Sequence, residues 1–350
     1  MAAEELIVLR PEGLYCPAGD FYIDPWRPVE RAVITHAHAD HARRGHQRYL
    51  AAKAGECVLK QRLGEITLET LDYGQRLRIG EATVSLHPAG HVLGSAQVRI
   101  AHRGQVWVAS GDYKLTPDAT CTAFEPVRAD VFVTESTFGL PVYRWPAPEA
   151  VFAEINAWWG ANAAAGRASI IACYAFGKAQ RILAGVDASI GPIIVHGAVA
   201  GLNRAYAASG VALPETHLAS EIEREALGRA LVLAPPAATA ASWVRRFTTP
   251  VGPPEIAFAS GWMRLRGARR RGGYDRGFVL SDHADWPGLL SAIAATSAER
   301  VIVTHGYEAP LRRYLEERGL QSGRFETRFG GSEEEAAEAE ALNPLAEAAA

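Results

Sequence analysis

The sequence predicts an α/β protein of two domains, on three observations. Short apolar runs rich in β-branched residues, which are typical of buried strands, recur through roughly the first 135 residues. Three prolines fall within residues 141–148 and interrupt this pattern as a linker would. Beyond them, helix-like and strand-like segments alternate up to about residue 262, which indicates a small parallel sheet in a second domain.

Length and composition narrow the class of protein. The chain has 350 residues, with 48% hydrophobic and 21% charged residues, as in globular enzymes. A formal net charge of −3 gives no global basic field for nucleic acid, although a local basic groove is compatible with it. The four cysteines form no CxxC pair, which argues against a thiolate zinc site. We expect a cytoplasmic protein, since neither a signal peptide nor a membrane-spanning stretch is visible.

The N-terminal part is expected to consist mainly of strands separated by turns. The expected strands cover residues 6–9, 21–24, 32–35, 66–71, 77–79, 83–87, 106–110 and 131–134, with another near Leu59. Near the C-terminal end, strands are expected over 277–280 and 301–303, with a helix over 289–295 between them.

One of these strands leads into a dense group of possible metal ligands. Residues 32–35 run directly into His36-Ala37-His38-Ala39-Asp40-His41, which we expect to form a turn between the strand and a helix. Burying these rings without partners would cost several kcal/mol each. Neutral imidazole and carboxylate are the ligand set of zinc and similar divalent ions. The spacing therefore predicts a metal site rather than a polar turn that is rich in histidine by chance.

Further polar residues follow other expected strands or lie between glycines. They are His91, Asp112, Glu135, His283 and His305. Loops at strand ends are where sites are built on layered α/β scaffolds, so these residues are candidates for the same site.

The second domain contains one candidate anion site. Helices are expected over 152–165 and 178–186, and strands over 169–172, 192–195, 231–234 and 256–259. Gly177 and Lys178 follow a strand and open a helix, whose free N–H groups, with Lys178 and Arg181, suit a substrate phosphate. The alternative is a plain turn with a surface lysine.

Two charged segments remain. Arginines cluster among glycines at Arg264, Arg266, Arg269, Arg270, Arg271 and Arg276. They fit a solvated loop and a phosphate-contacting loop equally well. Residues 332–350 are acidic and rich in alanine, as in a frayed helix or a disordered tail.

This chain has the series His36-x-His38-x-Asp40-His41, then His91, then Asp112. In order and rough spacing, the series resembles the metal ligands of metallo-β-lactamase-fold hydrolases. Glu135 in Glu-Ser-Thr-Phe-Gly, His283 in Ser-Asp-His-Ala-Asp and His305 in Thr-His-Gly look like motifs A, B and C of the β-CASP nucleases, which include Artemis-type DNA nucleases and the nuclease subunit of the mRNA 3′-end cleavage factor. Residues 177–181 and 259–263 also resemble β-CASP segments. The compact length of the chain and the residues of these motifs are similar to those of the bacterial ligase-associated DNA exonucleases.

The resemblance implies a metallo-β-lactamase four-layer αβ/βα sandwich with an inserted β-CASP α/β cap domain. Residues 1–144 and 270–331 would form the discontinuous metallo-β-lactamase domain, and 145–269 the cap. The acidic tail, 332–350, would lie outside both.

The resemblance also implies ligand and catalytic roles. One metal would be held by His36, His38, His91 and Asp112, and a second by Asp40, His41, Asp112 and His305, with Asp112 bridging. The ions would be zinc or manganese, with iron also accepted by such ligands. The residues expected to act in catalysis are Asp40, Glu135 and His283. His283 would be the general acid, oriented by Glu135; alternatively, Glu135 supports a metal-bound histidine.

The implied function is a two-metal-dependent DNA nuclease, an exonuclease in DNA repair, that attacks phosphodiester bonds with a metal-bridging hydroxide. Its partners would be DNA and a DNA ligase and helicase of a repair pathway, with no membrane. The alternative is a β-CASP RNA-processing nuclease. A small-molecule metallo-hydrolase is a weaker alternative, because such enzymes lack the cap and motifs B and C.

Overall fold

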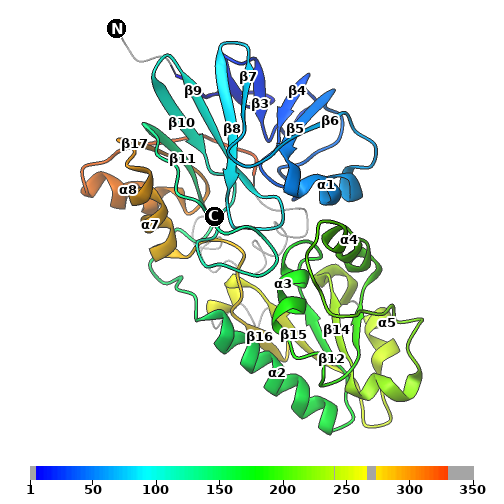
Figure 1. The fold of residues 1–350 in the computed structure, drawn as a ribbon. Helices are drawn as coiled ribbons and strands as arrows, with labels where there is room; N and C mark the ends of the chain where they lie inside the picture. The colour runs from blue at the N-terminus through cyan, green and yellow to red at the C-terminus, as the bar shows by residue number, and fades with distance from the viewer. Residues whose placement is uncertain (1–4, 240, 266–272, 330–350) are drawn as a thin grey trace. The chain divides into compact units, whose positions relative to one another are not determined.

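A computed structural model describes residues 5–239, 241–265 and 273–329 of the chain (Figure 1). The described residues up to Arg144 form one compact unit with those from His283 onward, and Trp145–Asp282 form a second. The boundaries between the two units lie at 144/145 and 282/283. The resemblance implies boundaries at 144/145 and 269/270. Four of the clustered arginines (Arg266, Arg269, Arg270 and Arg271) and the acidic tail, 332–350, lie outside the described residues.

The first unit contains two mixed sheets. The six-stranded sheet has the order β1-β2-β3-β4-β5-β6, formed by β1 (Val8–Arg10), β2 (Gly13–Cys16), β3 (Phe21–Ile23), β4 (Arg31–Val33), β5 (Arg48–Ala52) and β6 (Leu68–Leu71). The seven-stranded sheet has the order β18-β17-β11-β10-β9-β8-β7, formed by β7 (Arg76–Ile79), β8 (Ala82–Pro88), β9 (Ala96–His102), β10 (Gln105–Ala109), β11 (Val131–Ser136), β17 (Arg300–Gly306) and β18 (Gln321–Arg324).

Alternation along the strands builds the core of this unit. Val131 and Val133 of β11 pack into a buried cluster that joins both sheets, whereas Phe132 between them packs on the opposite face. Helices α7 (Trp286–Thr296) and α8 (Glu308–Glu317) contribute the apolar side chains that cover this opposite face. Successive side chains of the strand point to opposite faces, and both faces of the sheet are buried. This is expected for strands with helices on one side and a sheet on the other.

In the second unit, the predicted small parallel sheet is confirmed. Its five strands have the order β13-β14-β12-β15-β16 and are all parallel: β12 (Ser169–Ala172), β13 (Ile193–Val195), β14 (Leu231–Ala234), β15 (Glu255–Ala259) and β16 (Arg276–Phe278). Its helices are α2 (Pro148–Ala164), α3 (Lys178–Gly185), α4 (Gly197–Ala208) and the short α5 (Ala241–Val244). Side chains of α2, α3 and α4 form one buried cluster with this sheet.

Two local expectations are wrong. Leu59 lies in helix α1 (Glu56–Leu63), not in a strand, and is buried there like Val58 and Leu63. The histidine-rich turn leads to strand β5, not to a helix: Ala42 N–H donates to the carbonyl of His38 (2.8 Å), and the chain then turns back into the sheet. Among the described helices, none has the length and apolarity needed to cross a bilayer.

Candidate metal centre

The fold places the predicted ligands at the carboxyl ends of neighbouring strands. Strands β10, β11 and β17 are parallel neighbours, so their carboxyl ends share one edge of the sheet. Asp112 follows β10, Glu135 lies near the end of β11, and His305 lies near the end of β17. His91 follows β8, and the histidine-rich turn follows β4. The structure thus brings together residues that lie far apart in the sequence.

Four of these residues form a first group around one carboxylate. Ligand atoms of His36, His38, His91 and Asp112 all lie within 4.8 Å of one another, and all four side chains are largely buried. Asp112 Oδ2 is 3.5 Å from His36 Nε2 and 3.9 Å from His91 Nε2. His91 Nε2 is also 3.0 Å from His38 Nδ1.

A second group meets the same carboxylate. His41 Nε2 is 3.5 Å from Asp112 Oδ2 and 3.5 Å from Asp40 Oδ2. His305 Nε2 is 3.3 Å from the other oxygen, Asp112 Oδ1. Asp112 therefore faces both groups, which is the arrangement that a bridging ligand requires.

The donor atoms fit divalent ions. His36 Nε2, His41 Nε2 and Asp112 Oδ1 are buried, yet none of them makes a hydrogen bond with the described residues. Leaving a buried polar atom unsatisfied costs about 1–3 kcal/mol, and more for a charged group. A cation held by these nitrogens and oxygens would remove that cost, and imidazole with carboxylate suits zinc, manganese and iron.

The electrostatics of the ligand side chains also favour a bound cation. Burial, together with the charge of His41, lowers the pKa of His36 well below its usual value, so this ring is neutral and can offer a lone pair. Burial alone would raise the pKa of Asp112, but the nearby His41 and His305 hold it well below its usual range. Burial opposes charge on His41 too, yet Asp40, Asp112 and Asp24 raise its pKa to about 10.

The raised pKa of His41 predicts a pH dependence for the metal-free protein. A proton that the folded state binds more tightly stabilises it fully below the unfolded imidazole pKa of about 6.5, and this contribution is lost as pH rises through about 10. We expect the free energy of unfolding to fall over this range. Denaturant titrations in a chelator at several pH values measure it, and a His41→Gln variant should show a shallower dependence. Equal slopes in the two proteins would contradict the assignment.

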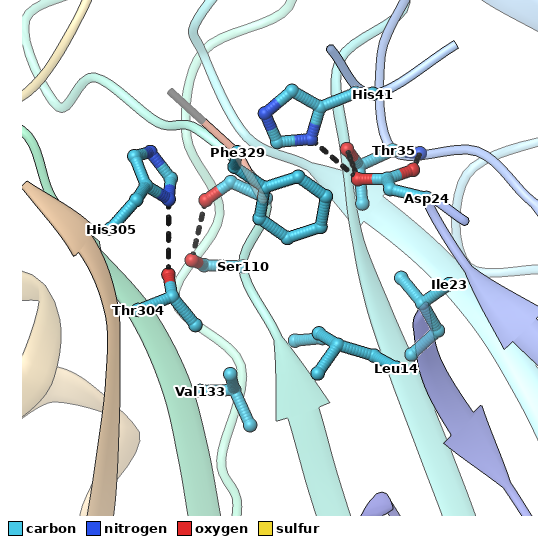
Figure 2. Close-up of a pocket in the computed structure, with 12 residues that line it drawn as sticks. Leu14, Ile23, Asp24, Thr35, His41, Ser110, Val133, Thr304, His305 and Phe329 are labelled. Carbon is cyan, nitrogen blue, oxygen red and sulfur yellow. Dashed lines mark hydrogen bonds and ion pairs between the residues drawn. The ribbon is translucent and has the colours of Figure 1, made fainter. Parts of the chain in front are cut away.

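One functional residue is absent from the sequence-based prediction: Asp24. It ends an expected strand, but nothing in its neighbourhood marks it as part of the site. Its carboxylate is buried and pairs with His41 Nδ1 at 2.7 Å (Figure 2). It also accepts hydrogen bonds from the backbone N–H of Thr35 (2.7 Å) and its hydroxyl (2.5 Å). Asp24 thereby fixes the His41 ring with Nε2 toward Asp112. Carboxylates commonly orient metal-binding histidines in this way.

We therefore expect Asp24→Asn to bind divalent metal about tenfold more weakly, because the neutral amide holds His41 less firmly. Calorimetric titration of the metal-stripped protein with Mn²⁺ measures the change. The matched control is Asp72→Asn, which alters an exposed aspartate that faces Lys53. Unchanged affinity in Asp24→Asn would show that Asp24 only stabilises the turn.

Glu135 and His283 form a pair beside the ligands. The buried Glu135 carboxylate lies 2.9 Å from His283 Nδ1 and also accepts the backbone N–H of Tyr113 at 2.8 Å. The His283 ring lies 4.6 Å from that of His91, measured between ring centres. Of the two partners considered for Glu135, His283 lies within hydrogen-bonding distance.

In the second unit, the predicted phosphate-binding cations already face a carboxylate. Lys178 and Arg181 are both buried, so the alternative of a surface lysine is wrong. Lys178 Nζ lies 2.8 Å from Asp282 Oδ2, and Arg181 Nη1 lies 3.2 Å from Asp282 Oδ1. The N–H of Gly177 donates to the side chain of Gln180 at 2.8 Å. Phosphate binding by these residues stays a prediction, and the phosphate would have to compete with Asp282.

Comparison with known proteins gives nucleases and a ligase. No protein-family model matches the chain. A probable DNA ligase of Opitutus terrae is 30% identical over 314 residues, which are 89% of this chain and 30% of that protein. Endoribonuclease ysh-1 of Neurospora crassa is 32% identical over 123 residues, which are 34% of this chain and 14% of that protein. Ribonuclease TTHA0252 of Thermus thermophilus is 28% identical in a match that covers 34% of this chain and 34% of that protein.

The chain thus spans about a third or less of the curated relatives named above. One similar solved structure, a protein of unknown function from Enterococcus faecalis, has a TM-score of 0.59 at 12% identity. The match covers 86% of this chain and 80% of that chain. At this identity, the likeness concerns the fold.

Proposed function

Because this chain belongs to the β-CASP group of metallo-β-lactamase nucleases and is related to ligase-associated proteins, we propose that it is a two-metal-dependent nuclease acting on DNA. The single observation that carries the proposal is Asp112, whose carboxylate lies within 3.9 Å of two groups of imidazoles. Each group has a buried nitrogen with no hydrogen bond among the described residues, His36 Nε2 in one and His41 Nε2 in the other. The paired sheets and the parallel sheet support assignment of the two units to the four-layer sandwich and the β-CASP cap.

The ligand groups define which residues would hold metal. His36, His38, His91 and Asp112 would hold one ion, and Asp40, His41, His305 and Asp112 would hold the other. A pair of divalent ions supplies an activated water near neutral pH and offsets negative charge on a phosphodiester. The buried Asp40 and Asp112 would balance the charge of the cations. Without metal, the same carboxylates stabilise the protonated ring of His41.

His283 is proposed as the general acid. Glu135 holds His283 Nδ1, so the ring would exchange its proton with the substrate through Nε2. The leaving oxygen of a phosphodiester is a poor leaving group without a proton, and a positioned imidazole supplies one near neutral pH. The carboxylate of Glu135 stabilises the protonated ring before the transfer and orients it during the transfer.

DNA is the favoured substrate. The similarity to the probable DNA ligase extends over 89% of this chain, whereas the similarity to each of the two ribonucleases extends over 34%. This difference supports a role beside a DNA ligase in repair, and a helicase of the same pathway stays a prediction. Exonuclease action is the finer part of the proposal, and an RNA-processing nuclease is the alternative.

The test uses metal-stripped protein and substrates labelled at the 5′ or the 3′ end, as single- and double-stranded DNA and RNA. Zinc, manganese and iron(II) are added back one at a time. We expect a ladder that shortens DNA from one end with at least one metal. Cleavage of RNA alone would select the alternative function, and no cleavage with any metal would refute the nuclease proposal.

A further inference from the structure

The segment that follows β18 brings an aromatic ring to the metal centre. Phe329 lies far in the sequence from the histidine-rich turn, yet its side chain lies beside His41 and His305 (Figure 2). Its ring is stacked on that of His41, with centres 4.4 Å apart and planes 15° apart. It meets the His305 ring nearly at a right angle, with centres 5.8 Å apart and planes 82° apart.

The Phe329 ring is anchored in the core. Strand β18 pairs in parallel with β17, and the backbone N–H of Phe325 extends this pairing by donating to Val303 O at 3.2 Å. The Phe329 ring then packs edge-on against Trp26, with centres 5.7 Å apart, and joins the buried cluster between the two sheets. Only 8% of the residue is exposed. Its place beside the histidines is therefore determined by packing.

Phe329 adds a constraint that hydrogen bonds alone do not supply. Asp24 holds His41 Nδ1 at 2.7 Å, but a single hydrogen bond lets an imidazole tilt out of its plane. An aromatic ring against the face of the imidazole blocks that tilt. His305 is in a similar situation: Thr304 Oγ1 lies 3.3 Å from its Nδ1, and the Phe329 ring limits the rotation of the ring.

The contacts of Phe329 are on one side of the centre. Within the described part of the chain, its ring contacts are with His41, His305 and Trp26. The rings of His36, His38 and His91 are packed against one another, with centres 4.8–4.9 Å apart, and the His36 ring also lies 4.2 Å from that of His41. Phe329 therefore contacts one group of ligands directly, and reaches the other only through the contact of His41 with His36.

We propose that Phe329 is a positioning residue for one of the two metal positions, the one formed by Asp40, His41, Asp112 and His305. The inference rests on the proposed two-metal function. Without the ring, His41 and His305 tilt and their Nε2 atoms no longer converge, so this position loses affinity. The other position keeps its ligands and their packing.

The experiment measures metal binding by the whole 350-residue chain after its metal has been stripped. Wild type, Phe329→Ala and Phe329→Tyr are titrated with Mn²⁺ by calorimetry, and bound metal is counted after dialysis. For Phe329→Ala we expect the second equivalent to bind about tenfold more weakly and the first within about twofold of wild type. Phe329→Tyr keeps a flat ring and should bind both equivalents nearly as wild type does. Spin coupling between the two Mn²⁺ ions, seen by electron paramagnetic resonance, should be lost in Phe329→Ala at limiting metal.

The matched control is Phe325→Ala, which removes a partly buried ring of the same segment that packs on the same core. Equal binding by Phe329→Ala and wild type would overturn the inference, and so would an equal loss in both equivalents or the same selective loss in Phe325→Ala. If Phe329→Ala does not fold, Phe329→Leu keeps apolar volume without a flat face and should show the selective loss. A wild-type protein that binds no metal would refute the proposed function instead.

Discussion

Asp112→Asn should abolish nuclease activity, with a loss of more than about a thousandfold, and should leave the protein with at most one bound metal ion. Asp112 Oδ2 lies within 3.9 Å of His36, His41 and His91, and Oδ1 lies 3.3 Å from His305. An asparagine offers one oxygen in place of two and no negative charge. It therefore cannot bridge two cations, and both ligand groups lose their shared member.

Metal content by mass spectrometry and cleavage of labelled DNA measure this effect together. The control is Asp130→Asn, an exposed aspartate whose carboxylate accepts the backbone N–H of Val106 at 2.7 Å, a role that the amide oxygen can take over. Circular dichroism should show both variants folded. Wild-type cleavage by Asp112→Asn would exclude the bridging role, whatever its metal content.

The strands that the sequence predicts best are those with apolar runs long enough to be unambiguous. Residues 169–172 and 231–234 are strands with the expected limits, because four buried aliphatic or small residues in a row suit a parallel sheet covered on both faces. Strand β2 (Gly13–Cys16) has no comparable run and is absent from the prediction. Leu59 is followed by Lys60, Gln61 and Arg62, so the apolar period of its helix is weak.

The site is partly predictable for a different reason. Three histidines and an aspartate within six residues are improbable without a ligand, so the turn is evident from the sequence alone. Asp24 and Phe329 are single residues of ordinary kind, and only the fold shows that each lies against His41. The burial of Lys178 and Arg181 depends on Asp282, about a hundred residues later in the chain. Pairings at such distances leave no local pattern.

His283→Ala should lower the rate of DNA cleavage by roughly 10²–10⁴-fold while both metal ions remain bound. The His283 ring adjoins that of His91, but its Nδ1 is held by Glu135 at 2.9 Å, which suits proton transfer. Glu135→Gln should lower the rate less, because the amide still holds the ring but no longer stabilises its protonated form. Metal counting on the same samples separates this loss from a loss of ligands.

The leaving group distinguishes proton donation from other roles of His283. A nitrophenyl phosphodiester releases a stable anion that needs no proton, so its hydrolysis should be nearly as fast in His283→Ala as in wild type. The pH profile for DNA cleavage should also lose the decline on its basic side, since that decline reports deprotonation of the acid. Equal loss of rate on both substrates would mean that His283 binds the phosphate or shapes the site. In that case Glu135, which contacts His283 through its carboxylate, would be part of the same binding structure and not of an acid pair.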